Sequence, residues 1–302
     1  GEDILVAGEY FRTANLRMQR QFWIYVVVFK KSCFRKQTMA GQLEKFVGEL
    51  ADLDYLKAES KLKKGIADFF KRTGREKAII GVSGGVDSAV ALALCAKALK
   101  PENVLGLAMP TKHTPNQDLA DAEALLKKLN CEYELFSLDK IVDEMASCWS
   151  MRPDKMVLGN LTARVRMAHL YAHANSLNGL VVGTGDRSEI AIGYFTKFGD
   201  GACDLLPLGG LLKTQVRKFG EHLGLPAAIT AKPSSPALWG DQSAEKELET
   251  TYEKVDAYLG MAEKGLGMAK IAEIVGKKDA ARIRQLIEYG SHKLELAPVI
   301  PI

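Results

Sequence analysis

The sequence predicts an α/β protein built on a parallel sheet with helices on both faces. Short apolar runs, typical of buried strands, occur at residues 78–80, 104–109, 133–136 and 180–183. A glycine-rich turn follows the first run and leads into an Ala/Leu-rich helical stretch at 89–99. Because strands that alternate with helices favour parallel pairing, we expect a Rossmann-like sheet with a helical C-terminal part.

A helical lead-in precedes the first strand. Between Gln42 and Arg72, apolar residues recur at helical spacing. After that strand, further helical patterns lie at 118–129, 141–146 and 161–174, between the later apolar runs. Ligands of such sheets bind at the carboxyl ends of the strands, which is where the glycine-rich turn is expected.

The character of the chain changes after Thr230. Residues 232–240 form an irregular Pro/Ser segment, and amphipathic helices are expected at 245–259, 268–275 and 280–289. The tail, 296–302, is apolar and bounded by prolines, so we expect it to dock on the protein or to lie in an interface.

Charge is concentrated at the N-terminus. The formal net charge of the 302 residues is +4, and the first 38 residues carry seven basic and three acidic side chains, which account for all of it. The remainder is neutral, so a general nucleic-acid-binding surface is not indicated.

Residues 1–38 are expected to be an N-terminal extension to a single domain at 39–302. The extension has basic flanks around an eight-residue apolar run, 22–29, far short of the roughly 20 residues that a membrane span needs. It resembles a signal sequence only superficially. We expect it to be dispensable, for instance as read-through ahead of a start at Met39, with an added strand or contact element as the alternative.

Five cysteines are spread along the chain without any C-x-x-C pair: Cys33, Cys95, Cys131, Cys148 and Cys203. This pattern indicates neither a zinc site nor a disulfide framework. It fits a reducing cytoplasm.

The glycine-rich turn reads GVSGGVDS and predicts a phosphate site. Glycines let the backbone approach a ligand, and the first N–H groups of the following helix favour an anion. The turn lacks the lysine and the glycine spacing of the commoner P-loop. It is similar to the pyrophosphate-binding loop of enzymes that split ATP into AMP and pyrophosphate. The alternative is a plain strand-to-helix turn in which Asp87 or Ser88 caps the helix.

A second cluster follows the run at 180–183. It comprises GTGDRSE at 183–189, GYFTKFGDG at 193–201 and DLLPL at 204–208, followed by Lys213-Thr214. Together with the loop, these ordered pieces closely resemble the ammonia-dependent NAD synthetases, from about Met39 to the end of the chain. The resemblance implies an adenine-nucleotide alpha-hydrolase-like fold. It also implies a ligase in which the carboxylate of deamido-NAD attacks the α-phosphate of ATP and ammonia displaces AMP from the acyl-adenylate.

The resemblance implies roles for residues on the ATP side. Asp87 and Glu189 would hold Mg²⁺, which prefers carboxylate and phosphate oxygens. Lys213 would neutralise phosphate charge during adenylyl transfer. The implied ATP-binding residues are Gly81, Val82, Ser83, Gly84, Gly85, Val86, Asp87, Ser88, Thr184, Lys213 and Ser235. For Ser235, a simple turn in the Pro/Ser segment is the alternative.

On the deamido-NAD side, the resemblance points to Arg164, Lys197, Asp204, His292 and Lys293. A guanidinium at Arg164 suits a phosphate or carboxylate, although an exposed helix arginine is the plain alternative.

Asp200, in a Gly-Asp-Gly turn, is the candidate for binding ammonium or accepting its proton, and with Lys213 it completes the catalytic pair. Asp186 departs from the family pattern, since many relatives carry Asn there.

The glutamine-dependent relatives carry a separate glutaminase domain, for which this sequence has no room. We therefore expect free ammonia as nitrogen donor, and the family implies a homodimer in which residues 165–174 and the tail contribute to the interface. Two alternatives remain: another ATP pyrophosphatase, such as one acting on tRNA, and a noncatalytic nucleotide-binding module. The neutral body argues against the first, and the presence of Asp87, Glu189 and Lys213 argues against the second.

Overall fold

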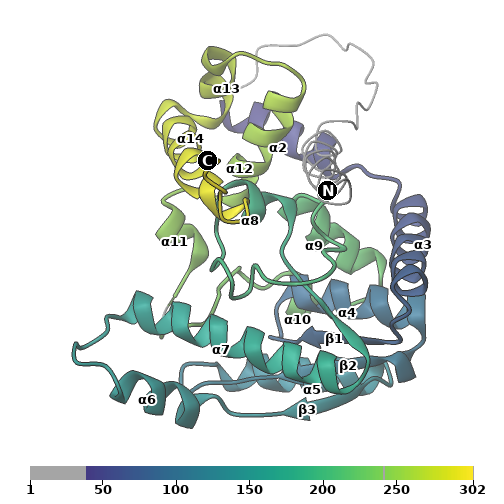
Figure 1. Cartoon of the computed structure of the whole chain (residues 1–302). Coiled ribbons are helices and arrows are strands. Elements are labelled where there is room, and N and C mark those ends of the chain that lie inside the picture. Colours follow the sequence, from purple (N-terminus) through teal and green to yellow (C-terminus); the bar gives the residue numbers. More distant parts are fainter. Residues whose placement is uncertain (1–38, 241, 302) are drawn as a thin grey trace.

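The structure, a computed structural model, describes residues 39–240 and 242–301 (Figure 1). The predictions for the N-terminal extension therefore lie outside the described residues. Within the described ranges, no helix combines the length and apolar character that crossing a bilayer requires.

A parallel sheet forms the base of the molecule. Its strands are β1 (Lys77–Gly81), β2 (Val104–Ala108), β3 (Glu132–Leu135) and β4 (Gly179–Val182), arranged in the order β3-β2-β1-β4. Every pairing is parallel, with Ile79 opposite Leu105 on one side and Val181 on the other. The predicted α/β fold is confirmed, and strand order reverses at β1, where a ligand crevice is expected.

Helices cover both faces of the sheet because β1 is apolar on both sides. Ala78 and Ile80 face a core shared with α3 (Tyr55–Thr73), α4 (Val86–Leu99), α5 (Asn116–Lys128), α9 (Lys213–His222) and α10 (Ala227–Thr230). Ile79 faces the opposite core, shared with α6 (Asp139–Ser147) and α7 (Lys155–Ser176). This alternation is the period-2 geometry of a strand buried on both faces.

A second group of helices stands away from the sheet (Figure 1). It contains α11 (Ala244–Leu248), α12 (Tyr252–Glu263), α13 (Met268–Val275) and α14 (Lys277–Gly290), and it has its own apolar core. α2 (Met39–Ala51) joins this group through Leu43, Phe46 and Val47. Short helices complete the chain: η1 (Pro101–Asn103), α8 (Arg187–Ala191) and η2 (Ser291–Lys293).

The structure divides two of the expected helical segments into separate helices, and it excludes one of the two places expected for the tail. The single lead-in is two helices, because Asp54 accepts a hydrogen bond from Lys57 N and starts α3 afresh. The helix expected at 245–259 is also two, since Glu249 adopts a left-handed φ of 56° and Thr251 caps α12. The tail does not dock on this chain: Leu296, Val299 and Ile300 are 75%, 89% and 87% exposed.

Replacing Glu249 with glycine is expected to stabilise the protein. An L-residue in the left-handed region costs roughly 1–2 kcal/mol, and glycine adopts that region without penalty but loses more chain entropy on folding. The net gain in the free energy of unfolding should be about 0.5–1 kcal/mol, measured by urea denaturation. A lower unfolding midpoint for Glu249→Gly would show that the side chain contributes more than its backbone conformation costs.

Candidate functional site

The glycine-rich loop leaves β1 and enters α4, as predicted. Ser88 Oγ accepts a hydrogen bond from Ser83 N at 3.2 Å and donates to the Gly85 carbonyl at 3.0 Å. Gly85 is the N-cap of α4, and it has no side chain that could cap, so the alternative in which Asp87 caps the helix is wrong. Uncapped N–H groups at a helix start suit an anion.

A lysine and a neighbouring helix hold the loop in place. Gly84 has a φ of +80°, and a Cβ there would lie 2.1 Å from the backbone oxygen of Asp118. Lys232 Nζ donates to the Gly84 carbonyl at 3.2 Å and pairs with Asp118 and Asp121 at 2.9 and 2.6 Å. Only glycine fits so close to another backbone at this φ.

A capping box after β4 orients the second acidic motif. Asp186 is the N-cap of α8 and accepts from Glu189 N at 2.8 Å, while Glu189 Oε2 accepts from Asp186 N at 3.2 Å. Because this reciprocal pair uses Glu189 Oε2, the other carboxylate oxygen, Oε1, is available for another partner. The two carboxylates are therefore fixed relative to each other before any ligand binds.

Lys213 lies at the centre of three carboxylates. Its Nζ is 2.8 Å from Asp87 Oδ2, 2.9 Å from Asp186 Oδ2 and 2.8 Å from Glu189 Oε1. Lys213 and Asp186 are fully buried, and the side chains of Asp87 and Glu189 are about one-fifth exposed. The structure thus brings together the two acids predicted as metal ligands and the predicted phosphate-neutralising lysine.

These groups shift one another's proton affinities. Burial, reinforced by the charge of Glu189, raises the pKa of Asp186 well above its usual value. Burial also raises the pKa of Glu189, with Lys213 opposing. Although burial disfavours the charged lysine, the carboxylates of Asp87, Glu189 and Asp186 raise the pKa of Lys213 well above its usual value.

The cluster fits a divalent cation. One oxygen each from Asp87, Asp186 and Glu189 lies within 4.8 Å of the others. Asp87 Oδ1 is buried and accepts no hydrogen bond from the described part of the chain, and the buried Asp186 Oδ2 faces the Lys213 ammonium. Three carboxylates face one ammonium, so the fully ionised cluster carries two more negative than positive charges. Carboxylate oxygens are hard ligands, and with that excess of negative charge they suit Mg²⁺.

Two other predicted ATP contacts lie near the strand ends or in the Pro/Ser segment. Thr184 closely follows β4, at the same edge of the sheet as the loop. Ser235 is exposed, and its hydroxyl donates to the Gln242 carbonyl at 2.7 Å while accepting from Ala237 N. Ser235 therefore forms the turn that the sequence left open as its alternative.

Most residues predicted for the deamido-NAD side gather in one cluster. Arg164 donates to the Lys197 carbonyl at 3.3 Å, Lys197 Nζ donates to the carbonyl of His292 at 2.8 Å, and Lys293 Nζ donates to the Phe195 carbonyl at 2.9 Å. Asp204 has different partners, Tyr171 and Val181. Its Oδ2 accepts from Val181 N at 2.8 Å, so this carboxylate satisfies the open edge of β4.

Asp200 has a carboxylate that accepts from Thr196 N at 2.8 Å. Asp200 is an exposed residue, and desolvation of its carboxyl raises the pKa of Asp200 against the hydrogen bonds from Thr196 and the charge of Arg166. A carboxyl with a raised pKa suits a proton acceptor near neutral pH.

Asp186 and Lys232 are residues of the site that sequence reasoning missed. For Asp186, a signal existed: Asp-x-x-Glu at the start of a helix is a capping box, which places both carboxylates side by side. Lys232 gave no comparable signal, because its partners in α5 lie more than 100 positions away in sequence.

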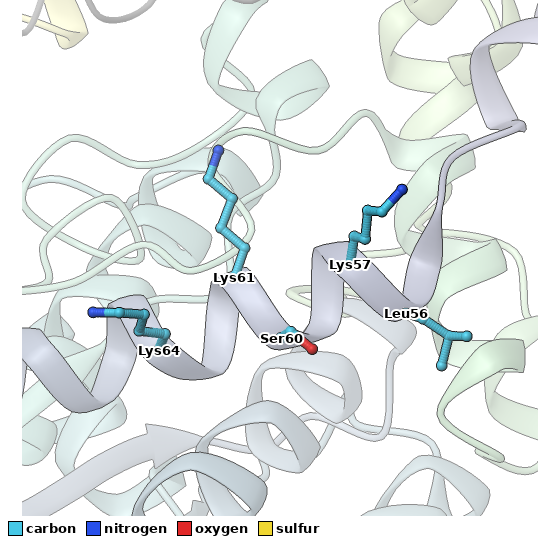
Figure 2. Close-up of a pocket in the computed structure, with 5 residues that line it drawn as sticks. All are labelled: Leu56, Lys57, Ser60, Lys61 and Lys64. Atoms are coloured by element: carbon cyan, nitrogen blue, oxygen red, sulfur yellow. The ribbon is translucent and has the colours of Figure 1, made fainter.

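A separate surface depression lies along α3 (Figure 2). Leu56, Lys57, Ser60, Lys61 and Lys64 line it, all from one helix. Lys57 pairs with Asp54, and Lys64 with Asp68. None of these side chains belongs to the predicted chemistry.

Comparisons with known proteins identify the family of this chain. The NAD synthase family model matches residues 59–297. The chain is 43% identical over 256 residues to an NH(3)-dependent NAD(+) synthetase from Hyperthermus butylicus, covering 83% of this chain and 93% of that protein. Two solved structures are similar. An NMN synthetase from Francisella tularensis has a TM-score of 0.76 and 35% identity, covering 83% of this chain and 100% of that one. An NH3-dependent NAD synthetase from Campylobacter jejuni has a TM-score of 0.71 and 29% identity, covering 82% of this chain and 100% of that one. This chain belongs to the NAD synthase family.

Proposed function

We propose that this chain catalyses the ATP-dependent amidation of deamido-NAD with ammonia, which yields NAD, AMP and pyrophosphate. The observation that supports this most is the convergence of Asp87, Glu189 and Lys213 beside a glycine loop at the carboxyl ends of β1 and β4. A carboxylate resists attack by an amine because its own charge repels the nucleophile and oxide is a poor leaving group. Activation as an acyl-adenylate removes both obstacles.

The chain's own residues position the phosphates and neutralise their charge. Gly81 to Ser88 and the start of α4 would hold the pyrophosphate portion through backbone N–H groups, with Thr184 against the AMP portion. Lys213 would stabilise the charge that develops as the α-phosphate is attacked. Binding both substrates at one strand edge makes the attack intramolecular in effect.

Asp87 and Glu189, together with Asp186, would hold Mg²⁺. The bound ion would supply further charge neutralisation on the phosphate oxygens. The buried Asp87 Oδ1, which has no hydrogen-bond partner among the described residues, and the closeness of the three carboxylates support this assignment.

Arg164, Lys197, His292 and Lys293 would bind deamido-NAD. Lys197 and Lys293 donate to backbone carbonyls in the structure, so contact with a dinucleotide phosphate requires them to exchange those partners. Asp204 would act by holding β4 rather than by touching the substrate.

Asp200→Asn is expected to leave adenylate formation intact and to slow aminolysis by about 10²-fold. The amide keeps the shape of the carboxylate and its acceptor oxygen for Thr196 N, but it cannot take a proton from ammonium. Release of pyrophosphate and formation of NAD are to be measured separately in single turnovers. An equal loss in both half-reactions would contradict the role.

The overall function is tested by incubating the purified chain with ATP, Mg²⁺, ammonium and deamido-NAD, and measuring NAD, AMP and pyrophosphate. Formation of ADP and orthophosphate would contradict it. Because one similar structure is an NMN synthetase, nicotinate mononucleotide should be compared with deamido-NAD as substrate. We expect higher kcat/KM with the dinucleotide, and glutamine should not replace ammonium.

We also propose a homodimer that works in the cytoplasm. Exposed apolar side chains extend from the end of α6 to the start of α7: Met145, Trp149, Met151 and Met156. They support an interface on that side of the sheet. Sedimentation equilibrium tests the dimer.

A further inference from the structure

The start of α9, which carries Lys213, is only partly capped from within the helix: Gln215 Oε1 accepts a hydrogen bond from Leu212 N at 2.9 Å. The N-cap residue is Leu212, whose apolar side chain cannot accept a hydrogen bond. The first backbone N–H groups of any helix lack intrahelical partners, and leaving them buried and unpaired is costly. The N–H groups of Lys213 and Thr214 therefore need partners from elsewhere in the fold.

Asp256 of α12 and Ser188 of α8 supply those partners. Asp256 Oδ2 accepts from Thr214 N at 2.8 Å, and Ser188 Oγ accepts from Lys213 N at 3.0 Å. The Ser188 hydroxyl in turn donates to Asp256 Oδ1. Asp256 and Ser188 are fully buried, so water cannot replace these bonds. One carboxylate thereby ties three helices together at the backbone of Lys213.

The same face of α12 also contacts the lysine ammonium. Tyr252 lies four residues before Asp256, one helical turn away, and both are fully buried. Lys213 Nζ lies 5.0 Å from the centroid of the Tyr252 ring, within the range of a cation–π contact. The Tyr252 hydroxyl has no hydrogen-bond partner among the described residues, so the ring rather than the hydroxyl accounts for this placement.

We propose that Asp256 is a positioning residue for adenylyl transfer: through Ser188 and the start of α9, with Tyr252 at the other end of the side chain, it fixes Lys213 among the metal-site carboxylates. This rests on the proposed function. It assigns to α12, a helix of the second group, an indirect part in the ATP-side chemistry: α12 positions the lysine that acts at the sheet edge.

Asp256→Asn tests the proposal with little change of shape. The amide can still accept from Thr214 N, but its nitrogen replaces the acceptor of the Ser188 hydroxyl, and the negative charge at the start of α9 is lost. We expect kcat for adenylate formation to fall about 10- to 100-fold while KM for deamido-NAD changes less than about twofold. Tyr252→Phe should retain activity, and Tyr252→Leu should lower kcat in the same way as Asp256→Asn.

A double-mutant cycle separates positioning from a purely structural role. The cycle compares Lys213→Met with the double variant Asp256→Asn/Lys213→Met, and kcat is measured in single turnovers with labelled ATP. If Asp256 acts through Lys213, the two variants should have the same kcat. Asp279→Asn is the control, since Asp279 is another carboxylate of the helical group, with 18% of its side chain exposed, and is bonded to Thr250 and Lys254. It should lower Tm without changing kcat. If Asp256→Asn fails to fold, Ser188→Ala takes its place in the cycle.

Unchanged kcat in Asp256→Asn, or fully additive losses in the cycle, would overturn the proposal while leaving the proposed function in place. Absence of AMP formation by the unmodified chain would instead overturn the proposed function, and this inference with it.

Discussion

Lys213→Met is expected to lower the rate of NAD formation by at least about 10³-fold. The side chain is fully buried, and its ammonium lies 2.8–2.9 Å from three carboxylates. Removal of one preorganised charge aimed at a reacting oxyanion typically costs roughly 10²–10³-fold in kcat. Here the loss should be larger, because the carboxylates left behind repel the approaching phosphates. Pyrophosphate release in a single turnover measures it.

The same change should lower the free energy of unfolding by about 3–5 kcal/mol, since it leaves buried carboxylates without their counter-charge. Urea denaturation measures this. If the cluster binds a divalent cation, Mg²⁺ should restore stability in Lys213→Met more than it stabilises the unmodified chain, because the cation replaces the missing positive charge.

Lys254→Met provides the matched control. Lys254 pairs with Asp279 at 2.8 Å in the second helical group and is partly shielded from solvent, with 30% of its side chain exposed. We expect a modest loss of stability and no change in kcat. Near-normal NAD formation by Lys213→Met would contradict the assignment of Lys213 to the chemistry, whatever its effect on stability.

The parts of the site that the sequence predicts are those whose geometry is local. The glycine loop lies between a strand and a helix, so its place at the carboxyl end of β1 follows from the chain order. Glu189 follows β4 for the same reason. Parallel strands put both ends at one edge, and the convergence of Asp87 with Glu189 needs no further information.

The parts that escaped prediction depend on contacts between distant segments. Tyr252 and Asp256 reach Lys213 only because α12 packs beside α8 and α9, and no spacing in the sequence encodes that approach. The break at Glu249 escaped for another reason. Glutamate is a good helix former, so its residue type does not indicate the left-handed conformation that this exposed residue adopts. In the sequence, Lys197 and Lys293 are indistinguishable from lysines free to bind a ligand, whereas in the fold they hold backbone carbonyls.

Gly84→Ala should disable the site through the backbone alone. A methyl group at this position would lie 2.1 Å from the Asp118 oxygen, which belongs to helix backbone and cannot swing aside. The left-handed φ adds roughly 1–2 kcal/mol of strain for any L-residue, and the overlap adds about 1–3 kcal/mol more. Relief requires the loop to separate from α5, which breaks the bond from Lys232 to the Gly84 carbonyl. We expect kcat/KM for ATP to fall at least about 10²-fold.

Two other glycines separate the causes of that loss. Gly74, at the end of α3, has a φ of +64° with nothing within 4 Å of the position that an alanine methyl would take, so Gly74→Ala should cost about 1–2 kcal/mol and leave kcat/KM for ATP unchanged. Gly210 has an ordinary φ and open space, so Gly210→Ala should change neither quantity appreciably. If Gly84→Ala behaved like Gly74→Ala, the close approach of the loop to α5 would have no part in ATP binding. If Gly84→Ala lowers kcat/KM for ATP and Gly74→Ala does not, the loss comes from the contact of the loop with α5, because backbone strain is common to both positions.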